Sequence, residues 1–283
     1  MKARQQGLAL VLVLWLVALL ALMAGSYAYQ VRTETRVIGA ARDLAEGRAL
    51  ARGAVARVAF GLLQAEGAGG ADPGFPVNGT PWGWELDGDR MLVRVIGASG
   101  LIDLNRASAP LLEAVLARAG LDPSVAGVMP DRLADWRDAD DLRALNGAED
   151  DDYRAAGRPE GAKDAPFEHA VEIGQVLGID RAMADRLAPV LTVHGGAGLN
   201  PEHAPREVLA LFDPTYAEAP DAVEPETSRA VIPLHLQAGG GRPDAYHVSV
   251  AVGREASTPR IFRAVIRLQD DEERAYRILE WTE

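Results

Sequence analysis

The sequence predicts an α+β protein in which one long N-terminal helix packs on an antiparallel sheet, with a large all-α insertion. Three observations support this prediction. An apolar run opens the chain and continues into a helical pattern, and no proline occurs before residue 73. Short alternating runs, typical of strands, occupy residues 82–96 and most of residues 231–281. Between them, about a hundred residues have the spacing of short helices.

The first thirty residues contain a candidate membrane segment. Residues 8–24 carry no charged side chain, while Lys2 and Arg4 precede them. A run of roughly 18–20 apolar residues crosses about 30 Å of hydrocarbon as a helix. The positive-inside rule then places the N-terminus in the cytoplasm and the remainder outside it. Two other interpretations stay open: a plain signal anchor, and a secretory signal cleaved near residues 24–26.

Residues 30–66 continue this segment as an amphipathic helix, although a juxtamembrane linker helix would have the same pattern. After a loop at residues 67–79, the runs Trp82–Leu86 and Met91–Ile96 flank an Asp-Gly turn and predict a hairpin. Trp82 and Trp84 share one face of this hairpin, and we expect them to pack in the core or on the long helix rather than to bind a ligand. Further strands are expected over Val231–Leu236, Ala245–Val252, Arg260–Leu268 and Arg274–Trp281, after an exposed loop at residues 213–228.

The intervening region predicts helices at Leu111–Leu116, Val125–Trp136, Val171–Leu177 and Met183–Leu191. Asn105 and Ser108 are candidate caps of the first helix, which Gly120 closes. The turns at Gly120 and at Gly178 resemble helix-hairpin-helix units, which bind DNA backbones in other proteins. A membrane-anchored DNA-binding or DNA-uptake protein is therefore the alternative function. The formal charge of −12 argues against it, because such binding needs cations to neutralise phosphates.

An acidic loop at residues 135–153 has the densest chemistry of the chain, with eight carboxylates near three arginines. Crowded carboxylates need a cation or arginines to neutralise them, and oxygen ligands beside an Asn-Gly turn suit Ca²⁺. The spacing is not that of an EF-hand, and a solvated loop with local arginine pairs is the alternative. The candidate metal ligands are Asp138, Asp140, Asp141, Glu149, Asp150, Asp151 and Asp152.

No catalytic pattern is found in the sequence. The chain has five histidines, none in a His-Glu-x-x-His spacing, and it lacks a Gly-x-Ser-x-Gly elbow and a Walker loop. Cysteine is absent, which excludes thiol chemistry and disulfides. We therefore expect no enzymatic activity.

Gln5-Gln6-Gly7-Leu8, directly before the apolar run, resembles a type IV prepilin cleavage site. The resemblance implies that prepilin peptidase cuts after Gly7 and that Leu8 becomes an N-methylated mature N-terminus. Most pilins and pseudopilins carry Glu as the fifth mature residue, where this chain has Leu12. A buried carboxylate is retained in a bilayer only where it meets a partner. Its absence fits a subunit at the tip of a filament.

Several motifs of the insertion resemble the K-type minor pseudopilin of type II secretion systems (general secretion pathway protein K). They are Ile102–Asn105, Asp135–Asp140, Asn146–Asp150 with Tyr153, Lys163–Phe167, Leu191–Val193, Leu199–Pro201 and Ala204-Pro205. The resemblance runs over most of the chain in the same order of parts. It implies a pilin-like body with a helix-hairpin-helix, or SAM-like, inserted domain that binds structural Ca²⁺.

The same resemblance implies five segments. They are a leader (1–7), a transmembrane segment (8–29), the long helix with the first strands (30–100), the inserted domain (101–228) and the C-terminal strands (229–283). It also implies a single-pass inner-membrane protein with a periplasmic C-terminal domain. Such a protein would cap or initiate the pseudopilus and support export of folded proteins across the outer membrane. Its expected partners are I- and J-type minor pseudopilins and the major pseudopilin, with no nucleic acid.

Overall fold

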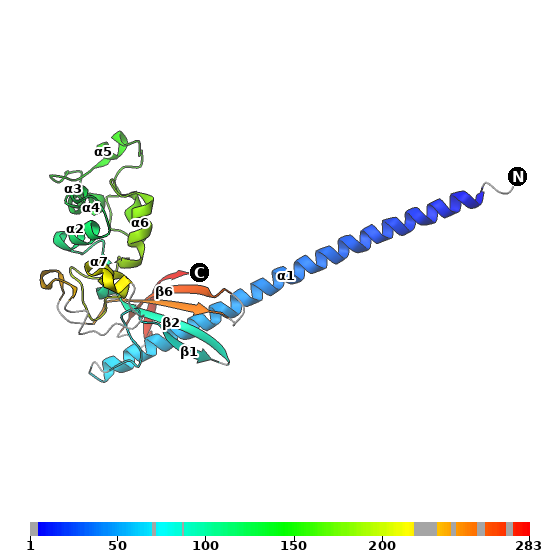
Figure 1. The fold of residues 1–283 in the computed structure, drawn as a ribbon, viewed down its shortest axis with the longest axis horizontal. Helices are drawn as coiled ribbons and strands as arrows, with labels where there is room; N and C mark the ends of the chain where they lie inside the picture. Colours follow the sequence, from blue (N-terminus) through cyan, green and yellow to red (C-terminus); the bar gives the residue numbers. More distant parts are fainter. Residues whose placement is uncertain are drawn as a thin grey trace. The chain divides into compact units, whose positions relative to one another are not determined.

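Five antiparallel strands form the main sheet in the order β1-β2-β5-β6-β7 (Figure 1). The strands are β1 (Trp82–Leu86), β2 (Asp89–Gly97), β5 (Tyr246–Val252), β6 (Arg260–Leu268) and β7 (Tyr276–Thr282). This computed structural model describes residues 5–69, 72–86, 88–217, 231–238, 242–253, 258–269 and 274–283. The α+β class predicted from the sequence is therefore confirmed.

Helix α1 (Gln5–Gly67) begins in one unit of the chain, residues 1–50, and ends in a second, residues 51–283. In the first unit, the window Leu10–Tyr27 has a mean hydropathy of 2.4. The described side chains of this window are exposed, Leu12 among them. By length and composition the window is able to cross a membrane. The helix predicted over residues 30–66 is confirmed.

In the second unit, the C-terminal part of α1 packs against one face of the sheet. Its buried residues recur at helical spacing: Ala51, Ala54, Val55, Val58, Ala59 and Leu62. Opposite them, alternate residues of the central strands are buried: Met91, Val93, Val95, Val248, Val250, Phe262, Ala264 and Ile266. The Arg52 guanidinium lies 5.7 Å from the centre of the Trp281 ring, and the Trp82 ring stacks on Phe75 at 5.2 Å. The predicted packing role of Trp82 is thus confirmed.

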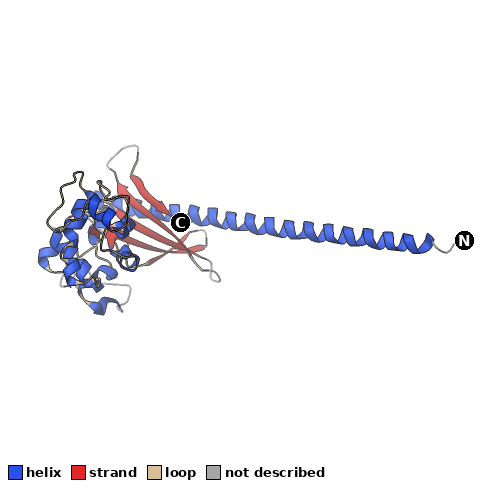
Figure 2. Ribbon diagram, turned by 90° about the horizontal axis from the view of Figure 1, so that it is seen from above, coloured by secondary structure: helices blue, strands red, loops and turns tan. Residues whose placement is uncertain are grey.

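The helical insertion connects β2 to β5 and gathers at one end of the strands (Figure 2). Its helices are α2 (Ala109–Arg118), α3 (Pro123–Ala126), α4 (Met129–Arg137), α5 (Asp150–Ala155), α6 (Arg181–Leu187) and α7 (Arg206–Phe212). Short 3₁₀ helices lie at Ala98–Gly100, Ala170–Gln175, Ala188–Val190, Pro214–Ala217 and Leu234–Leu236. A separate apolar core fills the insertion, with Leu111, Leu116, Met129, Leu133 and Leu187 buried in it.

A two-stranded parallel ribbon joins distant segments of the insertion. Its strands are β3 (Ile102–Asp103) and β4 (Leu191–Thr192). Asp103 is fully buried, and its carboxylate accepts hydrogen bonds from the N–H groups of Asn105 (2.7 Å) and Gly195 (2.6 Å). The ribbon and this carboxylate therefore fix the start of the insertion to the segment that follows α6.

Several local predictions are corrected. The helix predicted over Val125–Trp136 is two helices, α3 and α4, because the chain turns at residues 127–128 and Pro130 suits the first turn of a new helix. The strand predicted at Val231–Leu236 is wrong. Pro233 lies in its middle, where it would remove a ladder hydrogen bond, and a 3₁₀ helix follows at Leu234–Leu236.

The predicted caps of α2 are also corrected. Ser108 precedes α2 but makes no side-chain capping bond. The Asn105 side chain instead exchanges two hydrogen bonds with the backbone of Phe167, at 2.8 and 2.9 Å. Asn105 thus joins β3 to a loop 62 residues further on. Residues 1–4 of the predicted leader and residues 218–228 of the predicted loop lie outside the described residues.

Candidate functional site: the acidic cluster of the insertion

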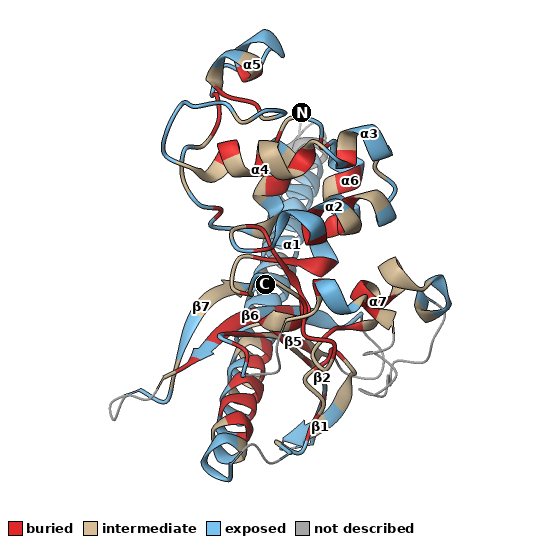
Figure 3. Ribbon diagram, turned by 90° about the vertical axis from the view of Figure 1, so that its left-hand side faces the viewer, coloured by how far each residue is buried: buried red, intermediate tan, exposed pale blue. Residues whose placement is uncertain are grey.

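The acidic cluster lies at the end of the insertion around α4 and α5, away from the sheet (Figure 3). Beneath it, Trp136 of α4 packs against Tyr153 of α5 at 5.5 Å and against Phe167 at 6.2 Å, between ring centres. These buried rings fix the two helices, and the carboxylates project from the segments between them.

Two carboxylates of α4 hold the backbone of the acidic loop. Asp135 accepts hydrogen bonds from Ala144 N–H at 3.2 Å, and Asp131 accepts from Asn146 N–H at 3.0 Å. A Cβ added at Gly147 would lie 1.7 Å from Asp135 Oδ2. The Asn146-Gly147 pair is therefore explained by close approach of the backbone to a buried carboxylate. Burial also raises the pKa of Asp135.

Asp138 and Glu149 form the inner part of the cluster. Within the described residues, Asp138 Oδ1 and Glu149 Oε1 are buried and have no hydrogen-bond partner. Burial, followed by the charges of Asp135 and Asp138, raises the pKa of Glu149 from 4.5 to about 7. The pKa of Asp138 is also raised, by burial and then by Asp140. Because buried polar atoms are nearly always paired, two such oxygens require an explanation.

Asp164, an exposed residue of a loop that follows α5, is close enough to Glu149 and Asp138 for their charges to interact. Its backbone has a φ of 54°, the one positive φ of a non-glycine residue among those described. Burial and the charges of Asp150, Asp141 and Asp138 raise its pKa. The sequence-predicted ligand set omits Asp135 and Asp164. Asp164 belongs to the Lys163–Phe167 motif described above. The sequence alone does not show that this motif lies near Asp138 and Glu149, because many residues separate them along the chain.

Four of the remaining predicted ligands have local partners, while Asp141 is exposed. Asp150 pairs with Arg154, Asp151 pairs with Arg154 at 2.6 Å, and Asp152 pairs with Arg143 at 3.2 Å. Asp140 accepts from Leu142 N–H at 2.9 Å. Over the ranges that the structure describes, no group of three or more His, Cys, Asp or Glu side chains has the geometry to hold a metal ion. The predicted set thus contains two members with an unpaired buried oxygen, Asp138 and Glu149, and three outer members that pair with arginines, Asp150, Asp151 and Asp152.

Each of the two hairpin turns of the insertion receives a hydrogen bond from an arginine that belongs to the other hairpin. Arg186 of α6 donates to Ala119 O at 2.8 Å, beside Gly120, and Arg132 of α4 donates to Leu177 O at 2.9 Å, beside Gly178. A Cβ at Gly120 or Gly178 would lie 3.0 or 2.6 Å from the same two guanidinium groups. Each turn is therefore covered by an arginine from the other half.

Carboxylates occupy the helix starts after these turns. Asp122 accepts from Ser124 N–H at 2.9 Å, and Asp180 accepts from Met183 N–H at 2.7 Å. A phosphate binding at such N–H groups would meet a negative charge at each turn. This arrangement disfavours the DNA-binding alternative.

Four of the histidines make structural contacts. His194 Nε2 lies 3.1 Å from Glu280 Oε1, and His247 Nε2 lies 2.9 Å from Thr192 Oγ1. His169 lies 3.7 Å from the other oxygen of Glu280, and His203 contacts Ser99 at 2.8 Å. These contacts join the insertion to the sheet or brace its loops.

The long helix with its C-terminal part on an antiparallel sheet defines a pilin-like protein, here with a helical insertion. The sequence model of the family described as "Type II secretion system (T2SS), protein K" matches residues 93–196. The Type II secretion system protein K of Pseudomonas aeruginosa is 29% identical over 243 residues, 77% of this chain and 72% of that protein. The chain is therefore similar to protein K of the type II secretion system, within the matched segment of the family model and over most of its length to the Pseudomonas protein.

A solved structure is also similar to this chain. It is the GspK-GspI-GspJ complex from the enterotoxigenic Escherichia coli Type 2 Secretion System. The match has a TM-score of 0.48 and 16% sequence identity, and it covers 71% of this chain and 82% of the other.

Proposed function

We propose that this protein caps or initiates the periplasmic pseudopilus, and that it acts mechanically rather than as an enzyme. The observation that supports the proposal most strongly is the absence of a carboxylate from the membrane-spanning part of α1. The window Leu10–Tyr27 contains no acidic side chain, and Leu12 occupies the position where most pseudopilins have Glu. A subunit above would leave its own terminal amine without a partner in the bilayer. Together with the similarity to protein K, this favours a place at the tip.

In this proposal the chain spans the inner membrane once and its second unit lies in the periplasm. Prepilin peptidase cuts after Gly7 and leaves a methylated Leu8. I- and J-type minor pseudopilins join it at the tip, and the major pseudopilin lies below them. Export of folded proteins across the outer membrane then depends on this assembly. The similarity to protein K and the apolar helix near the N-terminus support these steps.

The test of the assembly route is complementation of a strain that lacks this protein. Gly7→Asp blocks leader cleavage, so we expect no recovery of secretion. Gly25→Ala is the matched control in the same helix, because a Cβ there meets nothing within 4 Å. It should restore secretion fully. Secretion and processing at the wild-type level with Gly7→Asp would contradict the proposal.

We further propose that the inner carboxylates bind structural Ca²⁺. Asp138 and Glu149, which have the two buried oxygens, would contact the ion. Asp140, Asp141, Asp150, Asp151 and Asp152 would contribute negative charge around it. Support comes from the two buried oxygens without partners and from the hard-oxygen character of the group. The ion would neutralise the crowded charges and order the loop.

Thermal unfolding in calcium and in EDTA tests this site, since a ligand of the native state must raise its stability. We expect a higher midpoint in calcium for the wild type and a much smaller difference for Asp138→Asn. Asp185→Asn removes one exposed carboxylate from α6 and should keep the wild-type response. Equal midpoints in the two buffers for the wild type would refute calcium binding.

A further inference from the structure

Two arginines follow the apolar window of α1, at the end that the positive-inside rule leaves poor in cations. Arg32 and Arg36 come after Tyr27, the last residue of the window. In the proposed mature chain, which begins at Leu8, no cationic side chain precedes the window. Membrane proteins concentrate Lys and Arg at the cytoplasmic ends of their spans. An arginine pair at the opposite end therefore requires an explanation.

The two arginines share one face of α1 with an aromatic residue. Residues three and four apart are neighbours on a helix, so Tyr29, Arg32 and Arg36 lie in one row. All three side chains are exposed, and we call these residues the arginine row. Glu34 lies between the arginines in sequence but on another face, where the Gln30 amide donates a hydrogen bond to it at 3.1 Å.

The carboxylates of the helix leave the two arginines without an ionic partner. Gly39 and Ala40 occupy the positions three and four residues beyond Arg36. The next carboxylate on that side, Asp43, lies about 10 Å further along the helix axis. Helical side chains lean toward the N-terminus, so the Arg36 side chain leans away from it. Neither arginine makes an ion pair with any residue that the structure describes.

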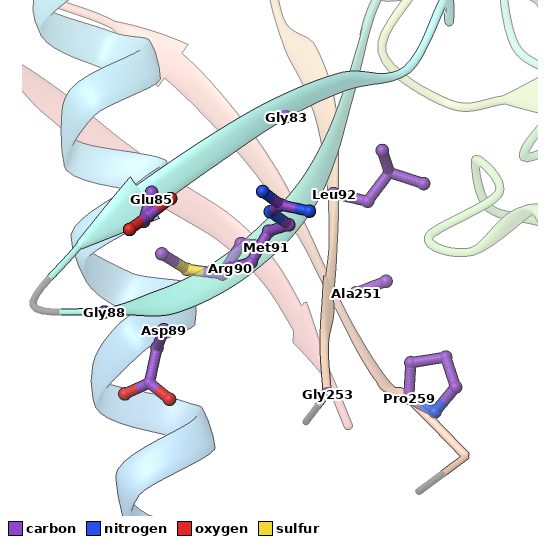
Figure 4. Close-up of a pocket in the computed structure, with 10 residues that line it drawn as sticks. All are labelled: Gly83, Glu85, Gly88, Asp89, Arg90, Met91, Leu92, Ala251, Gly253 and Pro259. Carbon is purple, nitrogen blue, oxygen red and sulfur yellow. The ribbon is translucent and has the colours of Figure 1, made fainter. Parts of the chain in front are cut away.

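Two other arginines show the more usual arrangement, with carboxylates beside them. Further along α1, Arg42 pairs with Glu46 at 2.8 Å. On the sheet, Arg90 is in register with Glu85, and both line the hollow shown in Figure 4 together with Asp89. That hollow has charges of both signs and selects no ligand by charge. The arginine row has charge of one sign only, and so it selects an anion.

The position of the row along the helix matches the headgroup layer of a bilayer. Beyond about 30 Å of hydrocarbon, each headgroup layer adds roughly 5–8 Å. Counted from Tyr27, Arg32 lies about 7 Å and Arg36 about 13 Å along the axis. Because helical side chains lean toward the N-terminus, both arginines lean back toward the bilayer. Long side chains near the ends of spans extend to the interface in this way.

Phosphate is the group in this layer that a pair of guanidinium groups recognises. A guanidinium keeps its charge at all relevant pH values, and its planar N–H donors match the oxygens of a phosphate. Tyr29 adds a ring of the kind that is enriched at membrane–water interfaces. The chain as a whole has a formal charge of −12, which an anionic bilayer repels, so attraction depends on cations held at the surface.

We propose that the arginine row binds the phosphate groups of anionic phospholipids in the periplasmic leaflet of the inner membrane. The inference rests on the proposed function, because it needs the apolar helix to stay in the bilayer with the second unit in the periplasm. It adds a class of lipid and the residues that recognise it. Binding at this level fixes the depth of the span in the membrane before assembly.

The experiment reconstitutes full-length protein, purified from its native membrane, into phosphatidylcholine vesicles. A spin-labelled phosphatidylglycerol or phosphatidylcholine is added, and electron spin resonance gives the ratio of their association constants at the protein surface. We expect a preference for phosphatidylglycerol of at least about threefold, which Arg32→Gln with Arg36→Gln should abolish. Arg42→Gln with Arg181→Gln removes the same number of charges from two exposed ion pairs and should keep the wild-type ratio.

Salt and free phosphate distinguish the sources of the phosphate group. Raising NaCl should lower the wild-type ratio, because exposed charges are screened. If inorganic phosphate lowers the ratio far more than NaCl at equal ionic strength, the row binds free phosphate and the lipid proposal is wrong. Equal ratios for the wild type and the Arg32/Arg36 double variant would also overturn it. Unchanged thermal unfolding of the variants would show that they fold.

Carbonate extraction of wild-type membranes separates this proposal from the proposed function. If the wild type is released from the membrane, the apolar helix is not retained and both proposals fail. If it is retained but binds phosphatidylglycerol no better than phosphatidylcholine, only the role of the arginine row is refuted. The proposed function at the pseudopilus tip then stands.

Discussion

Glu149→Gln should stabilise the protein at alkaline pH when calcium is absent. The carboxyl of Glu149 has a pKa of about 7 in the folded protein, against an ordinary value of 4.5, because burial and neighbouring carboxylates disfavour its charge. The folded state therefore holds a proton that the unfolded state releases between these two values. Since the folded state binds more protons there, stability falls as pH rises through that window.

The size of the effect follows from the two pKa values. Each pH unit within the window changes the free energy of unfolding by about 1.4 kcal/mol, so the full span costs about 3 kcal/mol. Glutamine keeps the shape and a hydrogen-bond acceptor but never ionises. Relative to the wild type, Glu149→Gln should therefore gain up to about 3 kcal/mol between pH 4.5 and pH 8.

His247 changes stability with the opposite sign. Burial, followed by His194, lowers its pKa from 6.5 to about 4, so its contribution rises with pH between these values. Both the variant and the wild type contain His247, so its contribution cancels when their free energies of unfolding are subtracted at each pH. In the wild type alone, the contribution of Glu149 to the free energy of unfolding is seen most clearly above pH 6.5, where His247 no longer contributes a change.

The assay is denaturant unfolding of full-length protein in detergent and EDTA, followed by tryptophan fluorescence at several pH values. In calcium the order should invert at pH 8, because the ion neutralises Glu149 and the glutamine variant binds it less well. A difference between the variants that stays constant from pH 4.5 to pH 8 in EDTA would refute the reasoning about burial. Loss of the inversion alone would refute only the calcium site.

Three further predictions follow from the contacts of the insertion. Gly147→Ala should destabilise the protein by about 1–3 kcal/mol, because its Cβ would displace the buried Asp135 carboxylate. Gly196→Ala is the control: its Cβ has nothing within 4 Å, so it should leave the free energy of unfolding unchanged in the same assay. Arg186→Met should cost about 1–3 kcal/mol by leaving the carbonyl of Ala119 without its donor, and an unchanged unfolding midpoint would contradict the reciprocal closure of the hairpins. The protein should not shift duplex DNA at low salt in a gel assay; a salt-sensitive shift would restore the DNA-binding alternative.

Periodicity predicted the C-terminal part of the long helix and most of the sheet because the apolar residues of these elements face the core between them. The alternation in β6 gave its bounds, Arg260–Leu268, as the structure has them. Pattern failed where local chemistry overrides it. Val231–Leu236 alternates like a strand, but Pro233 cannot donate to a ladder. Asn105 is of a residue type that often caps helices, yet its side chain bonds to the backbone of Phe167, 62 residues away.

Composition predicted the acidic loop. It did not predict which carboxylates pair with arginines and which have a buried oxygen without a partner. Asp150, Asp151 and Asp152 stand together in the sequence because they form the first turn of α5, where arginines pair with them. Asp135 and Asp164, whose charges help to raise the pKa of Glu149, are far from it in the sequence, and only the packing of α4 and the following loops brings them close. Charge density along a chain therefore indicates where carboxylates gather, without indicating which of them lie together in the fold.

The mass of the mature N-terminal peptide, from protein purified out of its native membrane, tests the central claim most directly. Assembly into a pseudopilus requires removal of the leader with retention of the apolar helix. The account predicts a peptide that begins at Leu8 and carries one methyl group on its amine. A start near Tyr27 would indicate an ordinary secretory signal and contradict the pseudopilus model.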